Sequence, residues 1–201
     1  KLVRPEDYPK SYKDLLDPKW KGKIILQDPS IAGQGCVLFQ FLKEQYSNLD
    51  YFDQLAKQDV TILRDFSEIA RRVAVGESSL ALGLTPSYVM PFIQAGSPIK
   101  LISPVEGAWR SRNTYHLINK APHPNAAKVL IEYSLTKEAQ EKAAYLLGNM
   151  PARSDANYSF HPLVNEFVDS VKNWGEVDWR FMLEYDKDIQ AGTAKKIFGM
   201  K

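Results

Sequence analysis

KIILQDPSIAGQG, residues 23–35, is the stretch that decides the fold. Its first five residues form a short apolar, β-branched run, which is typical of a buried strand. Asp28 and Pro29 end that strand, and small polar residues then lead into a helix with Leu38, Phe41 and Leu42 on one face. A strand followed at once by a covering helix is the unit from which α/β folds are built.

The same unit recurs further along the chain. Strands are predicted at 60–63, 79–84 and 99–102. Together with the strand at 23–27, they make a small sheet of four strands. A helix is predicted behind Asp65, and another from about 86 to 95. Thr85 can cap that second helix and Gly96 suits its left-handed end. The pattern therefore predicts an α/β layer structure.

The second half of the chain is predicted to be mainly helical. Residues 113–118 read as a last long strand, and helices follow at 124–135 and from Thr136 onward. Weaker helical patterns cover about 162–173 and 178–200. We expect these segments to complete the fold around the sheet.

Composition narrows the class of protein. The 201 residues are 44% hydrophobic and 25% charged, which is close to the average for soluble globular domains. The 26 basic and 24 acidic residues give a net charge of +2, so the sequence lacks the basic footprint of a nucleic-acid binder. The single cysteine, Cys36, excludes an internal disulfide. No apolar run approaches the roughly 18 to 20 residues that span a bilayer.

Three predicted turns between strand and helix are rich in small polar residues. In an open α/β sheet such turns meet at the carboxyl ends of the strands, where ligands bind. Gly33 and Gly35 would let the backbone approach a ligand closely. The alternative interpretation is an ordinary loop with helix-capping residues. The candidate ligand-binding residues in these turns are Ser30, Gly33, Gln34, Thr85, Ser87 and Tyr88.

A second candidate group precedes the predicted strand at 113–118. Glu106, Trp109 and Arg110 combine an acid, an indole and a guanidinium, a set suited to fixing a small polar ligand. The alternative is a solvated loop with a partly packed Trp109. The three histidines lack the spacing of metal ligands, and no catalytic or nucleotide-binding motif is present. We therefore predict no cofactor, no metal site and no enzyme activity.

Several phrases resemble one known family. SYKDLLDPKWKGKI at 11–24 resembles a segment of the solute-binding proteins of the ferric-iron and related ABC import family. Four shorter phrases occur in that family in the same order: VGE at 75–77, AGSPI at 95–99, APHPNAAK at 121–128 and TKEAQ at 136–140. The resemblance spans nearly the whole chain.

The resemblance implies a type II periplasmic binding protein fold, with two α/β lobes around a ligand cleft. Residues 1–110 would form the second, C-terminal lobe, and 111–155 a crossover strand and helices of the first lobe. Residues 156–201 would be a helical tail that packs back on the second lobe. The chain would then be a truncated fragment of a periplasmic or extracytoplasmic protein whose signal sequence lay in the missing N-terminal part.

The implied function is that of the solute-binding component of an ABC transporter, which carries a small-molecule or ionic solute to the permease membrane subunits. Iron-binding members carry two adjacent tyrosines in the turn that here holds Tyr88 alone. The hydroxyl groups of Ser30, Thr85 and Ser87, with Arg110, fit a polar or anionic ligand such as a phosphonate better. A ferric-iron or other metal-binding member, an effector-binding regulatory domain and an enzyme with dispersed residues remain the alternatives.

The predicted helix at 124–135 also has a consequence for association. Its apolar stripe should be buried on a sheet that this chain largely lacks, and exposed patches of that size usually find a partner. We therefore expect self-association, or a swapped arrangement, of the isolated chain.

Overall fold

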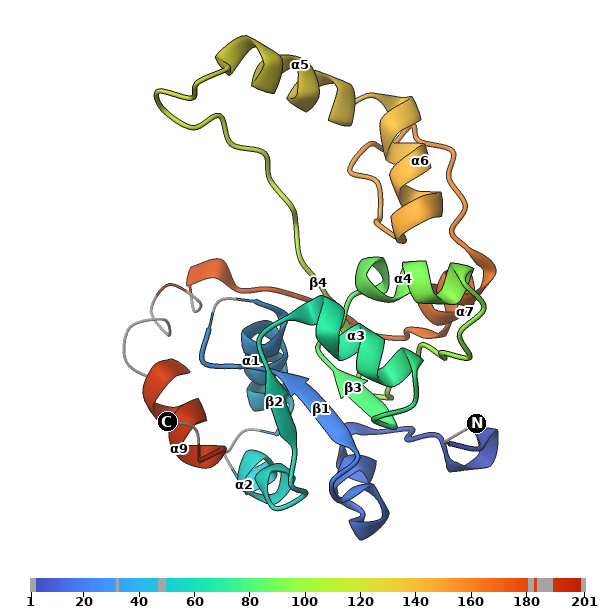
Figure 1. Ribbon diagram of the computed structural model, residues 1–201, viewed down its shortest axis with the longest axis vertical. Helices are drawn as coiled ribbons and strands as arrows, with labels where there is room; N and C mark the ends of the chain where they lie inside the picture. The colour runs from blue at the N-terminus through green and yellow to red at the C-terminus, as the bar shows by residue number, and fades with distance from the viewer. Residues whose placement is uncertain (1–2, 32, 47–49, 181–182, 184–189, 200–201) are drawn as a thin grey trace.

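A parallel sheet lies at the centre of the computed structural model, which describes residues 3–31, 33–46, 50–180, 183 and 190–199 (Figure 1). The strand order is β2-β1-β3. All four residues of the middle strand are buried, as the apolar run in the sequence predicts. The strands are β1 (Ile24–Gln27), β2 (Thr61–Leu63) and β3 (Leu80–Leu82).

Helices follow each strand and cover the sheet. Those of the first half are α1 (Gln34–Tyr46), α2 (Asp50–Ala56), α3 (Phe66–Ala74) and α4 (Pro86–Gln94). Three short 3₁₀ turns precede β1, at Pro5–Asp7, Tyr12–Leu16 and Pro18–Trp20. The main core lies between α1, α2 and β1, where Leu38, Phe52 and Ile24 are almost completely buried.

A second, two-stranded sheet joins distant parts of the chain. β4 (Ala108–Arg110) pairs in parallel with β5 (Trp174–Glu176). Between them the chain forms α5 (Pro124–Ser134), α6 (Lys137–Leu147) and α7 (Pro162–Ser170). A second core cluster, which includes Met90, Ala144 and Val164, packs α4, α6 and α7 together. The described C-terminal part ends with Gln190–Ala194 and α9 (Lys195–Ile197).

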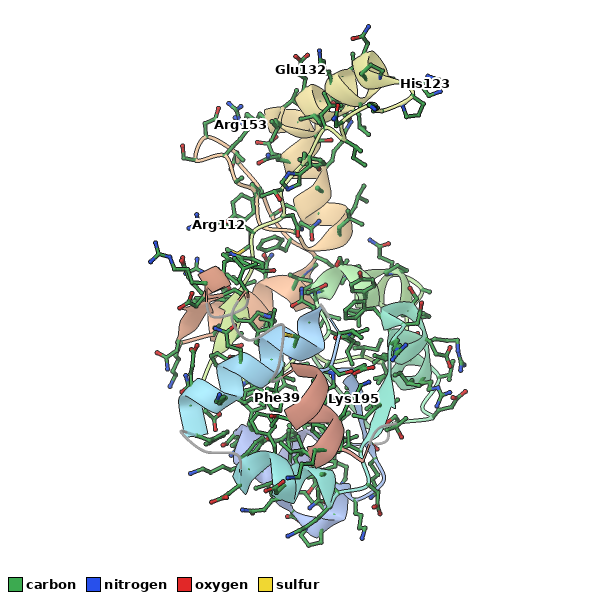
Figure 2. The ribbon with its side chains drawn as sticks, turned by 90° about the vertical axis from the view of Figure 1, so that its left-hand side faces the viewer. Phe39, Arg112, His123, Glu132, Arg153 and Lys195 are labelled. Carbon is green, nitrogen blue, oxygen red and sulfur yellow. The ribbon has the colours of Figure 1, made fainter. Side chains whose placement is uncertain are left out.

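Residues 111–155 project from the rest of the molecule, and we call them the arm. Figure 1 shows an extended segment that runs out from β4, then α5 at the far end and α6 returning toward α4. In Figure 2, Arg112 lies where the chain leaves the body, and His123 and Glu132 lie at the far end. The body is the remaining described chain.

Two predicted strands are wrong. Residues 99–102 form no strand; Ile99 and Leu101 instead pack on the second core cluster, which explains their apolar pattern. Residues 113–118 are exposed and outside any ladder in the described chain, because no neighbouring strand is there to pair with them. The predicted four-stranded sheet therefore has three strands. The helices predicted at 86–95 and 124–135 are confirmed to within one residue at each end.

Candidate ligand-binding site

The three parallel strands bring their carboxyl ends to one edge of the sheet. β1 pairs with both β2 and β3, so the segments that follow the strands are neighbours. We call the described residues of 28–34, 64–67 and 83–88 the rim. α3 and α4 start at the rim and lie on the side of the body that faces the arm (Figure 1). This edge is where an open α/β sheet binds ligands.

A buried carboxylate organises one part of the rim. Asp28 accepts hydrogen bonds from the Ser30 backbone N–H at 2.8 Å and from the Ser30 hydroxyl at 2.6 Å. The Arg64 Nε donates to its other oxygen at 3.0 Å. Burial acts to raise the pKa of Asp28, but the bonds from Ser30 and Arg64 outweigh it and lower that pKa below its usual value. Asp28 is therefore ionised and holds both neighbours in place.

Arg64 is the cation that this arrangement presents to solvent. Its side chain is 71% exposed, whereas that of Asp28 is 5% exposed. Among the hydrogen bonds of the described residues, Arg64 donates to this carboxylate through Nε, which leaves its two terminal guanidinium nitrogens as further donors. A guanidinium held in this way is suited to a planar or tetrahedral anion.

Contacts with Gln27 explain why the turn before α1 contains Gly33 and Gly35. The Gln27 Oε1 accepts a hydrogen bond from the Gly35 N–H, and its side chain lies directly under the turn. A Cβ on Gly35 would lie 2.1 Å from the Gln27 backbone oxygen, and one on Gly33 would lie 3.0 Å from the Gln27 amide nitrogen. These contacts require small residues even without a ligand. The close approach seen here is to Gln27, which favours the ordinary-loop interpretation for the glycines.

Threonine, serine and tyrosine form the part of the rim after β3. The Thr85 and Ser87 hydroxyl oxygens are 2.8 Å apart and hydrogen-bonded. The expected capping bond from the Thr85 side chain to the start of α4 is absent, and the Thr85 hydroxyl is hydrogen-bonded to Ser87. Tyr88 stacks on Phe66 with ring centroids 4.6 Å apart. Two hydroxyl groups and an aromatic pair therefore sit at the starts of α3 and α4.

Trp109 connects β4 to the rim. Its indole Nε1 donates to the Gln34 Oε1 at 2.9 Å, and its ring is 5.8 Å from that of Phe41. Arg110 lies over the Trp174 ring at 5.2 Å. Trp109 and Gln34 thus meet at the edge of the rim, whereas Arg110 is engaged with β5.

Glu106 lies away from the rim. Its carboxylate accepts hydrogen bonds from the Ser11 and Tyr46 hydroxyl groups and from the Tyr12 backbone N–H. Tyr46 is the last residue of α1 and Gln34 is the first, so Glu106 contacts the end of the helix opposite to Gln34. In this structure Glu106 ties the N-terminal segment to α1.

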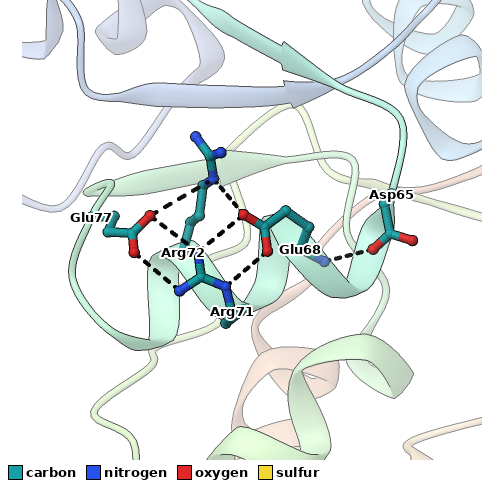
Figure 3. A network of polar contacts seen from close by, with 5 residues as sticks. All are labelled: Asp65, Glu68, Arg71, Arg72 and Glu77. Carbon is teal, nitrogen blue, oxygen red and sulfur yellow. Dashed lines mark hydrogen bonds and ion pairs between the residues drawn. The ribbon is translucent and has the colours of Figure 1, made fainter.

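An ion-pair network stabilises α3, the helix that begins at the rim. Asp65 caps the helix by accepting from the Glu68 N–H at 2.7 Å. Glu68 then pairs with Arg71 and Arg72, and both arginines pair with Glu77 (Figure 3). The hydrogen bonds from Arg71 and Arg72 lower the pKa of Glu68 to about 2. The network holds the helix that starts next to Arg64.

The rim therefore combines hydroxyl groups, an exposed guanidinium and the amino ends of helices, all of which favour anions. Within the described residues no group of three or more His, Cys, Asp or Glu side chains could hold a metal ion. A separate hollow of about 370 Å³ lies at residues 6–20, and its walls share no residue with the rim.

Sequence reasoning missed Asp28 and Arg64 as site residues. Both directly follow a strand, which is the signal that could have identified them. Their contact depends on the pairing of β1 with β2, across 36 residues of sequence.

Comparisons with known proteins agree on one family. The family model described as bacterial extracellular solute-binding protein matches residues 2–184. An uncharacterized protein of Haemophilus influenzae is 28% identical over 151 residues, which cover 69% of this chain and 40% of that protein. A putative 2-aminoethylphosphonate-binding periplasmic protein of Salmonella typhi is 25% identical over 177 residues, which cover 83% of this chain and 52% of that protein.

Solved structures agree on the fold. A periplasmic thiamin binding protein superposes with a TM-score of 0.71 at 16% identity, over 97% of this chain and 61% of that one. The fold is thus the α/β type II periplasmic binding protein fold, of which this chain provides a part. The chain spans about half the length of the curated relatives it matches.

Proposed function

Since this chain belongs to the bacterial extracellular solute-binding protein family, we propose that its rim is one wall of the ligand site in the solute-binding component of an ABC importer. The site binds a solute and releases it unchanged to the permease membrane subunits. The single observation that carries the proposal is the rim itself, where Asp28 holds Arg64 and Ser30 beside the starts of α3 and α4.

The solute is a small polar or anionic molecule. The terminal guanidinium nitrogens of Arg64 supply charged donors, and the hydrogen-bonded pair of Thr85 and Ser87 retains one O–H that can donate. The Ser30 hydroxyl donates to Asp28, so it offers the solute an acceptor. Gln34, Trp109 and Tyr88 complete the wall as neutral polar and aromatic groups. A phosphonate or similar oxyanion matches these donors. The printed name of the Salmonella relative, a putative 2-aminoethylphosphonate-binding protein, supports this class of ligand.

The arrangement of lobes follows from the same proposal. Residues 1–110 form the second lobe and the arm belongs to the first, so the ligand would lie between the rim and the arm. The tail returns to the second lobe, which the pairing of β5 with β4 supports. Closure around the solute would bring the two lobes together.

The site of action is periplasmic or extracytoplasmic. The family is one of extracellular proteins, and the printed name of the Salmonella relative is that of a periplasmic protein. Among the helices in the described part of the chain, not one is long and apolar enough to cross a membrane.

The test is calorimetric titration of the protein with 2-aminoethylphosphonate. Arg64→Ala removes the charged donor, and we expect the dissociation constant to rise about 10-fold to 100-fold, as for loss of a charged hydrogen bond. Arg4→Ala is the matched control, because Arg4 is 73% exposed and its Nε also donates to a carboxylate, that of Asp7, at 3.1 Å.

Two results would contradict the proposal. Absence of binding by the unaltered protein would argue against the phosphonate class of ligand. If Arg64→Ala and Arg4→Ala raised the dissociation constant equally, the result would argue against the rim as the ligand site.

A further inference from the structure

A hydrogen bond between Trp109 and Gln34 links the base of the arm to the rim. Trp109 lies in β4, and the extended segment of the arm leaves the body directly after this strand (Figure 1). Gln34 is the last residue of the rim segment 28–34 and the first residue of α1. The Trp109 Nε1 donates to the Gln34 Oε1 at 2.9 Å, across 75 residues of sequence. The bond therefore joins a side chain of the rim to an element outside the rim.

The chemistry of the indole decides which end of the Gln34 amide faces it. An indole N–H donates a hydrogen bond and cannot accept one, so it must face the amide oxygen. The amide nitrogen, Nε2, is then turned to the other side of the group. Among the described residues Nε2 has no hydrogen-bond partner, so its two N–H groups remain available to a ligand. Without the indole, the amide could turn over and present its oxygen instead, because this torsion is broad and roughly two-fold.

Contacts within the fold hold the backbone of Gln34 between two segments of the rim. A Cβ placed on Gly83, the first residue after β3, would lie 3.5 Å from the Gln34 carbonyl carbon and oxygen. The next residue, Gly35, donates its N–H to the side chain of Gln27, which is almost completely buried. The Gln34 side chain is thus fixed at its root by the fold and at its tip by Trp109.

The indole is itself held in place on two sides. Its ring centroid is 5.8 Å from that of Phe41, a buried residue of α1. The register of β4 and β5 sets Trp109 opposite Gly175, and a Cβ there would lie 3.2 Å from the Phe41 ring. Strand pairing and this aromatic contact together make Trp109 a firm support for the amide.

We propose that Trp109 is a positioning residue for the solute: its indole N–H holds the Gln34 amide so that Nε2 donates to an oxyanion of the solute. The proposal rests on the proposed function of the rim. A donor that is already oriented loses less conformational freedom on binding than one that rotates freely. The bond therefore favours oxyanions over solutes that would need an acceptor at this point.

Calorimetric titration with 2-aminoethylphosphonate tests this role in a double-mutant cycle. Trp109→Phe removes the N–H and keeps an aromatic ring beside Phe41, and we expect the dissociation constant to rise roughly 3-fold to 10-fold, as for one neutral hydrogen bond. Gln34→Ala should weaken binding by a similar factor. In the Gln34→Ala background, Trp109→Phe should have no further effect, because it acts through the amide. Trp174→Phe is the matched control, since Trp174 is also half-buried and lies in the paired strand β5, and it should leave the dissociation constant unchanged.

Nuclear magnetic resonance of the indole N–H groups gives a readout that needs no ligand. The Trp109 signal is identified by its loss in Trp109→Phe, and Gln34→Ala should shift it while the Trp174 signal stays in place. An unshifted Trp109 signal would overturn the proposal. So would an equal loss of affinity on Trp109→Phe with and without Gln34, which would show a merely structural role. An effect of Arg64→Ala equal to that of Arg4→Ala would instead overturn the rim as the ligand site, and this proposal with it.

Discussion

Gly35 is a glycine because of a residue eight positions earlier in the sequence. A Cβ at this position would lie 2.1 Å from the Gln27 backbone oxygen, far inside van der Waals contact. The Gly35 N–H also donates to the Gln27 side chain. The turn that begins α1 is therefore held by a contact within the fold, and its glycines say less about the ligand than the sequence suggested.

Gly35→Ala should lower the free energy of unfolding by about 3 kcal/mol, the upper part of the range for overpacking a buried position. Denaturant unfolding followed by circular dichroism measures the change. Gly192→Ala is the control, because nothing lies within 4 Å of a Cβ placed there. Equal stabilities of the two variants would contradict this account of the turn.

Individual contacts at the rim were only partly predictable from the sequence. Ser30, Gln34, Thr85 and Ser87 could be found because they lie in polar turns directly after strand patterns. The bond between Arg64 and Asp28 could not, since it depends on which strands pair. Glu106 was a candidate because it belongs to a segment rich in acidic, aromatic and basic residues. Its hydrogen-bond partners Ser11 and Tyr46 come from segments distant in sequence, so the sequence could not reveal them.

At the scale of elements, Glu106 joins three segments of the body. It receives hydrogen bonds from the 3₁₀ turn at Tyr12–Leu16, from Ser11 before that turn and from the end of α1. Partial burial acts to raise the pKa of Glu106, but the bonds from Ser11 and Tyr46 prevail and lower it. The carboxylate therefore joins these elements in its ionised form.

This lowered pKa predicts how stability depends on pH. The contribution of Glu106 is complete above the pKa of an unfolded glutamate, about 4.3, and is lost as pH falls through the lower folded-state pKa. Glu106→Gln should lose about 1 kcal/mol at neutral pH and show a smaller further loss on acidification than the unaltered protein.

Urea unfolding at a series of pH values measures both effects. Glu132→Gln, on the exposed face of α5, controls for removal of a carboxylate. An acid dependence in Glu106→Gln as steep as that of the unaltered protein would count against the proposed role.

Helices and strands could be predicted where residues within the segment itself specify them. The apolar run of β1 and the Pro86 start of α4 are signals of this kind, and both elements are confirmed. β5 (Trp174–Glu176) has only three residues and exists through its pairing with β4, so its sequence carried no such signal. The apolar pattern at 99–102 was ambiguous, because packing on a core cluster and membership of a sheet favour the same residues.

At the scale of the whole molecule, the body and the arm differ in how they are stabilised. The body has a buried sheet and two core clusters, whereas α5 lacks buried residues and only α6 reaches the second cluster. The rim lies on the side of the body toward the arm (Figure 1). The family resemblance implies two lobes around a cleft, and the division of this chain between them stays a prediction. No local sequence pattern specifies which strands share an edge.

The central claim is that the solute binds at the rim, and hydrogen–deuterium exchange with and without 2-aminoethylphosphonate tests it most directly. We expect the ligand to slow exchange in peptides that cover 28–35, 64–67 and 83–88. Slower exchange confined to the hollow at residues 6–20, with unchanged exchange at the rim, would contradict the claim.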